Sequence, residues 1–138
     1  MTANETKAAK KPKREKAKAE ARKQARKDGP AQAHAQGVRI SARKVRVLAD
    51  QIRGKSVDFA LTFLAFQQRA GAPVLKKAID SAVANADQRK MDLDQLVVAD
   101  IQIDRAGTLK RFLPRAHGRA TPFKKQLAHV HVRLAEKN

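Results

Sequence analysis

The sequence contains no cysteine, no tryptophan and no tyrosine among its 138 residues. Without cysteine, the chain can form neither a disulfide framework nor a thiolate metal site. Long apolar runs are also absent, because the longest, "LTFLAF" from Leu61 to Phe66, is far too short to span a bilayer. The N-terminal segment is charged and lacks the apolar stretch of a secretory signal. We therefore expect a cytoplasmic protein with no membrane partner.

Acidic residues are few compared with basic ones, since 31 lysines and arginines stand against 13 aspartates and glutamates. The net charge is +18 and the isoelectric point is about 11.0. An excess of this size is typical of proteins that bind nucleic acids. A membrane surface would attract the same charge, but binding there also requires an apolar insertion face.

The composition changes near residues 27–37, where "KDGPAQAHAQG" separates two unlike segments. Up to Arg26 no large apolar residue follows Met1, so residues 1–36 are expected to be a basic extension that is disordered on its own. Its residues also favour helix, so it would either become helical on an anionic surface or serve only to keep the protein soluble. Residues 37–138 are expected to form one globular domain.

Three helices are predicted from apolar residues at helical spacing. After a short strand, the first helix follows the N-cap Ser41 and ends at Gly54, and the second runs from Val57 to Phe66 behind the N-cap Ser56. The third begins at Pro73, a favourable residue for a first turn. Its predicted apolar face consists of Leu75, Ala78, Ile79, Ala82, Val83 and Ala86. The small alanines would let a sheet or another helix approach closely.

Two later segments change to a period of two residues, which predicts β-strands. The expected inward residues are Val97, Ala99, Ile101 and Ile103 in the first segment, and Ala128, Val130, Val132 and Leu134 in the second. One apolar face per strand is typical of antiparallel strands packed on helices. The predicted fold class is therefore α+β, with three helices packed on a small antiparallel sheet.

The connection between these two strands is the strongest functional signal. No carboxylate lies between Asp104 and Glu136, and a connection of this length is either a floppy loop or a long two-stranded arm. Arginine and lysine side chains on such an arm would bind phosphate oxygens. The RNA-binding candidates in this stretch are Arg105, Lys110, Arg111, Arg115, Arg119, Lys124 and Lys125.

The same stretch indicates which nucleic acid is bound. Only Phe112 and Phe123 could stack on bases there, which is too few for a platform that grips single strands. DNA is disfavoured because no helix-turn-helix or zinc-finger spacing is present. Folded RNA, recognised by its shape and phosphates, is therefore the expected partner.

Other motifs carry no clear chemistry. The "GKS" at residues 54–56 resembles the end of a phosphate-binding loop, but Ala49 occupies the place of its first glycine. His129 and His131 share one side of a strand, yet no third metal ligand stands at a recognisable spacing. No acid, base and nucleophile converge, so neither an enzyme nor a metal or cofactor site is predicted.

Three blocks resemble the family of bacterial large-ribosomal-subunit protein twenty-two. They are "SARKVRVLADQIRGKSVDFAL", "LKKAIDSAVANA" and "KRFLPRAHGRATPFKKQLAHVHVRL", and with the intervening segments they cover residues 40–134. The third block is the most specific, with Lys110, then the run 115–119, then the run 129–134. Two features depart from the family: the lysine-rich extension is longer, and Pro122 suggests a bulge or an edge position in the returning strand.

The resemblance implies a structural protein of the large ribosomal subunit that binds ribosomal RNA, lies among neighbouring ribosomal proteins and supports subunit assembly. It implies a β-hairpin over residues 97–134 whose tip, residues 108–119, contributes to the wall of the polypeptide exit tunnel. Near the nascent chain and the macrolide site, the tunnel-facing residues would be Thr108, Leu109, Lys110 and Arg111. Arg43 and Lys44 of the first helix would be further RNA contacts. Neither a cofactor nor a homo-oligomer is implied.

Two other functions stay open on the sequence. A free RNA chaperone would carry the same charge, and sedimentation of the native protein with large subunits separates it from a ribosomal protein. An enzyme acting on RNA is disfavoured by the lack of a convergent acid, base or metal cluster, and nuclease assays with and without divalent metal test it.

Overall fold

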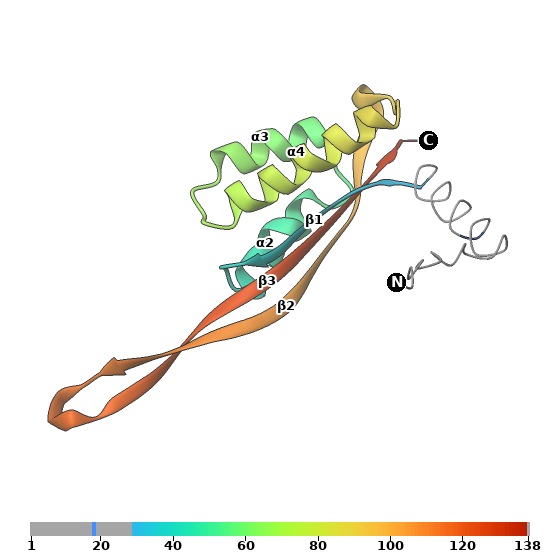
Figure 1. The fold of residues 1–138 in the computed structure, drawn as a ribbon. Helices are drawn as coiled ribbons and strands as arrows, with labels where there is room; N and C mark the ends of the chain where they lie inside the picture. The colour runs from blue at the N-terminus through green and yellow to red at the C-terminus, as the bar shows by residue number, and fades with distance from the viewer. Residues whose placement is uncertain (1–17, 19–28, 138) are drawn as a thin grey trace, which may run out of the picture.

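The computed structural model describes Lys18 and residues 29–137. Its main elements in chain order are β1 (Ala31–Val38), α2 (Ala42–Ile52), α3 (Val57–Phe66), α4 (Ala72–Gln88), β2 (Leu96–Pro114) and β3 (Ala120–Glu136). Short 3-10 helices, η1 (Leu93–Gln95) and η2 (Ala116–Gly118), precede β2 and β3. Figure 1 shows the helices beside the sheet, and β2 and β3 continuing past it as a long ribbon. The predicted α+β class with a protruding hairpin is confirmed.

The sheet contains a strand, β1, that lies earlier in the chain than the short strand predicted to lead into the first helix. The strand order is β1-β3-β2, and both pairings are antiparallel. Ala31 and Ala33 are buried, whereas His34 is exposed. The pattern "AQAHAQ" does alternate, but alanine is a poor strand former. β1 begins at Ala31, six residues before the position where the sequence analysis starts the globular domain. Apart from Lys18, the extension up to residue 28 lies outside the described residues.

A bulge in β2 changes which of its side chains face the core. The register against β3 shifts after Val98 and leaves Ala99 as an extra residue in the ladder. Val98 is buried before the bulge, and Ile101 and Ile103 are buried after it. The predicted inward positions Val97 and Ala99 are therefore wrong, because an extra residue moves the two-residue period by one.

The core lies between the sheet and the three helices. Its largest fully buried side chains include Leu48 and Ile52 of α2 and Leu75 and Ile79 of α4. All four inward residues predicted for β3 are buried, and α4, with its buried alanines, packs against β1 and β3. Within residues 29–137 no polar or charged side chain is buried. The charges described by the structure therefore all lie at the surface.

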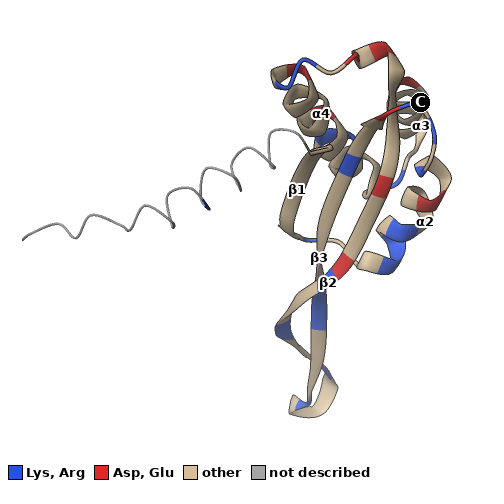
Figure 2. Cartoon of the chain, turned by 90° about the vertical axis from the view of Figure 1, so that its right-hand side faces the viewer, with Lys and Arg blue, Asp and Glu red and all other residues tan. Residues whose placement is uncertain are grey.

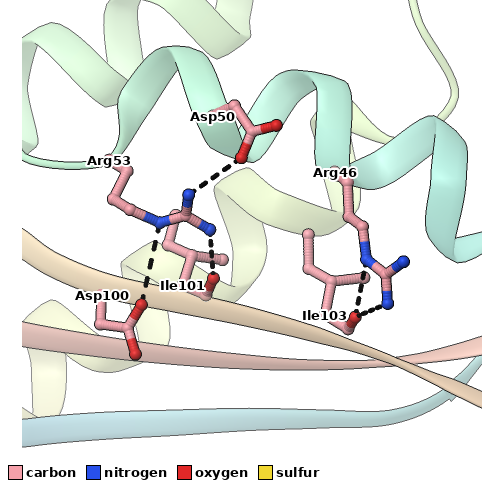
Figure 3. Close-up of polar contacts among 6 residues, drawn as sticks. All are labelled: Arg46, Asp50, Arg53, Asp100, Ile101 and Ile103. Atoms are coloured by element: carbon pink, nitrogen blue, oxygen red, sulfur yellow. Dashed lines mark hydrogen bonds and ion pairs between the residues drawn. The ribbon is translucent and has the colours of Figure 1, made fainter.

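Two arginines attach α2 to β2. The Arg46 guanidinium donates hydrogen bonds of 3.0 and 2.6 Å to the carbonyl oxygen of Ile103. Arg53, two turns later, donates to the carbonyl oxygen of Ile101 at 2.8 Å. As Figure 3 shows, Arg53 also forms ion pairs of 2.9 and 3.8 Å with two aspartates. Both arginines therefore hold the helix against the strand that leads into the hairpin.

We expect Arg46→Met to lower the free energy of unfolding by about 1–2 kcal/mol, because it keeps the apolar stem and removes hydrogen bonds from a charged donor. Urea denaturation of the full chain measures the change. Arg43→Met, at an exposed position on the same helix, is the matched control and should change stability by less than about 0.5 kcal/mol. Equal decreases in the two variants would show that the Arg46 hydrogen bonds to β2 contribute nothing.

Candidate nucleic-acid interface

Beyond the body, β2 and β3 form a two-stranded arm, a name used here for residues 105–125. β1 pairs with β3 only as far as Ala128, whereas β2 and β3 stay paired until the turn between them. A second bulge follows Arg105, at the junction of body and arm. Every residue from 107 to 124 is exposed. The arm therefore has no core of its own, and its stability rests on the strand ladder alone.

The arm ends in a turn over residues 115–119. The Arg115 N–H donates to the carbonyl oxygen of Arg119 at 2.8 Å, and His117 and Gly118 have φ angles of 59° and 69°. Glycine adopts such a positive φ without strain, which suits Gly118 to the closing position. The two arginines thus flank the distal end. The predicted tunnel-facing residues 108–111 lie in the paired ladder, nearer to the body than the turn.

Pro122 lies opposite Phe112 in the arm, and the register does not shift there. The predicted bulge at this proline is therefore wrong. The alternative prediction, an edge position, is confirmed, because each strand of a two-stranded ribbon has one open edge that needs no backbone donor.

The two faces of the arm carry different side chains. On one face Lys110 and Lys124 stand directly opposite each other, and a like-charge pair in this position destabilises a ladder. On the other face Phe123 stands opposite Arg111, and the ammonium of Lys125 lies 4.6 Å from the centre of the Phe123 ring. A phosphate between Lys110 and Lys124 would turn their repulsion into two charge-assisted hydrogen bonds.

At the base of the arm, cations surround a hollow beside the start of α2. One cavity of about 740 Å³ and an adjoining one of about 420 Å³ share Ser41 and Gln126, which are joined by a 2.7 Å hydrogen bond. The Ser41 hydroxyl thus donates to Gln126 and makes no capping bond to α2. We call the two cavities the basal hollow. Its cations are Arg39, Arg43, Lys44, Arg69, Lys124 and Lys125.

The basal hollow brings together predicted residues that lie far apart in the sequence. Arg43 and Lys44 come from α2, whereas Lys124 and Lys125 come from β3. Sequence reasoning missed Arg39, which follows β1, and Arg69, which lies in the loop between α3 and α4. No periodic signal marks either residue. The other candidates lie along the arm: Arg105 at the junction, Lys110 and Arg111 in the ladder, and Arg115 and Arg119 at the turn.

The segment 54–56 serves the fold. The Gly54 N–H donates to the carbonyl oxygen of Val98 at 2.8 Å, and the Val98 N–H donates to the carbonyl oxygen of Lys55 at 2.9 Å. The Ser56 hydroxyl accepts from the N–H of Phe59 at 3.4 Å, which makes it the N-cap predicted for this helix. These hydrogen bonds occupy the groups that a phosphate-binding loop would turn toward its ligand.

The described residues show an arm without acidic side chains rather than a reactive cluster. Figure 2 shows lysines and arginines on both the arm and the body, whereas the described acidic residues lie on the body alone. Among Lys18 and residues 29–137, no three histidine, aspartate or glutamate side chains gather as a metal site. In the same part of the chain, no helix is long and apolar enough to cross a membrane.

The fold and its surface define a class: a small, strongly cationic α+β protein whose charged hairpin extends beyond its core. The model of the family "Ribosomal protein L22p/L17e" matches residues 33–135. This chain is 50% identical over 105 residues to the large ribosomal subunit protein uL22 of Desulfosudis oleivorans, a match that covers 76% of this chain and 92% of the relative. The chain belongs to the ribosomal protein L22p/L17e family.

Two further relatives support this membership. The uL22 protein of Myxococcus xanthus is 50% identical over 107 residues, covering 75% of this chain and 94% of the relative. That of Pediococcus pentosaceus is 46% identical over 108 residues, covering 78% and 92%. The resemblance noted in the sequence is thereby confirmed. The chain is a structural component of the large ribosomal subunit in the cytoplasm and not an enzyme.

If the arm binds phosphates, neutralising its cations should flatten the dependence of RNA affinity on salt by about 0.7–0.9 in slope for each phosphate that is no longer bound. The variant converts four arm residues to glutamine: Lys110, Arg111, Arg115 and Arg119. The control converts four exposed lysines of the body: Lys55, Lys76, Lys77 and Lys90. Affinity for a large-subunit rRNA fragment is measured by filter binding at several salt concentrations. Equal slopes in the two variants would show that the arm has no special role in binding phosphates.

Proposed function

We propose that this chain binds ribosomal RNA through the arm and the basal hollow, supports assembly of the large subunit, and contributes the end of its arm to the wall of the polypeptide exit tunnel. The observation that carries the proposal is the arm, which has seven cations, no carboxylate and no buried side chain from 107 to 124. A ribbon without a core is marginal in water, so surrounding phosphates would fix its conformation.

The basal hollow and the arm would bind different parts of the RNA. The hollow presents six cations and the Ser41–Gln126 pair on the body, where they can hold RNA at the subunit surface. The arm carries its cations outward from there, and its part of β2, residues 105–114, spans roughly 33 Å at about 3.3 Å per residue. Contacts to phosphates position a protein on folded RNA without reading its sequence.

The tunnel assignment is supported by the family resemblance of the block from Lys110 to Leu134 and by the reach of the arm. The turn with Arg115 and Arg119 is the most distal part of the arm and is the segment that we assign to the tunnel wall. Residues 108–111, which the resemblance assigns to the tunnel, would then line the path toward it.

Sedimentation separates this proposal from a free RNA chaperone. A tagged chain at natural abundance should migrate with large subunits at salt concentrations that remove loosely bound proteins. Recovery mainly in the light fractions, together with transient binding to unrelated RNAs, would favour the chaperone.

Shortening the arm by two residue pairs should change the tunnel while sparing assembly. The variant lacks Phe112 and Leu113 together with their partners Thr121 and Pro122. Removing an even number of pairs keeps each remaining side chain on its face, retains every lysine and arginine, and withdraws the turn by about 7 Å. Ribosomes with this variant should form normal large subunits but respond differently to macrolides or stalling nascent chains.

A variant of unchanged length, with Phe112→Thr and Leu113→Thr, controls for the loss of these two apolar side chains of β2. If the length of the arm determines the effect, ribosomes with this variant should respond to macrolides and stalling nascent chains like those with the parent protein. Poor assembly of the shortened variant with unchanged macrolide and stalling responses would mean that the arm serves only to hold RNA together.

A further inference from the structure

His34 of β1 and His131 of β3 form a cross-strand pair on the body. They are direct partners in the register, and the neighbouring pairs turn Ala33, Val130 and Val132 inward. The pair therefore lies on the face of the sheet opposite the core. His34 is exposed and His131 is half-buried, so dissolved ions can reach both rings. The sequence analysis does not predict this pair because it assigns His34 to the N-terminal extension rather than to a strand.

The two rings point the same nitrogen at each other. Their Nδ1 atoms are 2.5 Å apart, their centres are 4.7 Å apart and their planes meet at 64°. Only one hydrogen fits between two nitrogens at this distance, so one Nδ1 donates and the other accepts. Two imidazole nitrogens that converge in this way are also two ligands for one metal ion, since neutral imidazole is the commonest metal ligand among side chains.

The distance between the nitrogens selects among metals. A metal ion about 2.0–2.1 Å from each nitrogen would hold them about 2.9 Å apart at a right angle and about 3.4 Å apart at the tetrahedral angle. The two Nδ1 atoms, now 2.5 Å apart, would have to move apart less for the right-angle arrangement than for the tetrahedral one. It belongs to square-planar sites, which copper and nickel prefer, whereas zinc prefers tetrahedral ones.

We propose that His34 and His131 chelate a divalent late transition metal through their Nδ1 atoms, with Cu²⁺ and Ni²⁺ favoured over Zn²⁺. Water would complete the coordination, since no third ligand joins the pair among the described residues. His129, on the same face, is already engaged, because its Nδ1 accepts the Gly37 N–H at 3.2 Å. Gln102, the neighbour of His131 on β2, donates its amide to Asp100 at 3.0 Å.

The bound metal would fasten the edge strand β1 to the central strand β3. In the described structure β1 has a single strand partner, and its pairing becomes irregular after Ala35. A metal that binds only when His34 and His131 are side by side stabilises the paired state. This site lies on the body and does not depend on the role proposed for the arm.

Titration of the full chain with Ni²⁺ and with Cu²⁺ in a non-chelating buffer tests the proposal. Calorimetry should show one site, and either His34→Gln or His131→Gln should weaken it at least tenfold. His129→Gln and His117→Gln are matched controls and should change the affinity less than twofold. Saturating Ni²⁺ should raise the thermal unfolding midpoint of the parent chain and slow amide exchange in residues 31–35, and neither effect should occur in His34→Gln.

Two results would overturn the inference. One is metal affinity that His34→Gln and His131→Gln leave unchanged, with unfolding of the metal-free variants showing that they remain folded. The other is an equal decrease in affinity in His129→Gln, which would indicate nonspecific binding to surface histidines. Tighter binding of Zn²⁺ than of Cu²⁺ would overturn the right-angle geometry.

Discussion

Within the body, β3 pairs with β1 on one side and with β2 on the other. Beyond Ala128, toward the turn of the arm, β3 pairs with β2 alone. The same strand thus runs without a break from a buried core into an exposed ribbon. Burial of Val130 and Val132 fixes β3 against the helices, and this in turn fixes where the arm leaves the body. Because the arm buries nothing itself, its direction depends on this one continuous ladder.

The cations of α2 show how the chain uses one helix for two purposes. Arg46 and Arg53 are seven residues apart, a spacing that keeps them on one helix face, and both donate to carbonyl groups of β2. Arg43 and Lys44 line the basal hollow instead. The first pair positions the base of the arm and the second offers charge to a partner. Substituting one pair should therefore affect stability, and substituting the other should affect binding.

The helices and the two long strands could be predicted because large apolar side chains repeat there with a clear period. The helix predicted over residues 57–66 matches α3 at both ends. The position and length of β1 were not predictable in this way, since its inward residues are alanines, which leave little apolar signal. The arm cations could be named from the sequence, but the basal hollow and the His34–His131 pair could not. Both depend on residues at or beside β1 that tertiary packing brings to β3.

The lengths of β2 and β3 show how bulges change the register between the two strands. β2 has 19 residues and β3 has 17, although they pair with each other from end to end. The two extra residues are accounted for by the two bulges, both of which lie on β2. Each bulge exchanges the faces of every following residue of β2 while β3 continues unchanged. After the second bulge, Lys110 lies opposite Lys124, on the face that continues the core-facing side of β3. Without that bulge an odd-numbered residue of β2 would pair with Lys124, and Lys110 and Lys124 would lie on opposite faces of the arm. The bulge at the junction therefore determines which cations can share one phosphate.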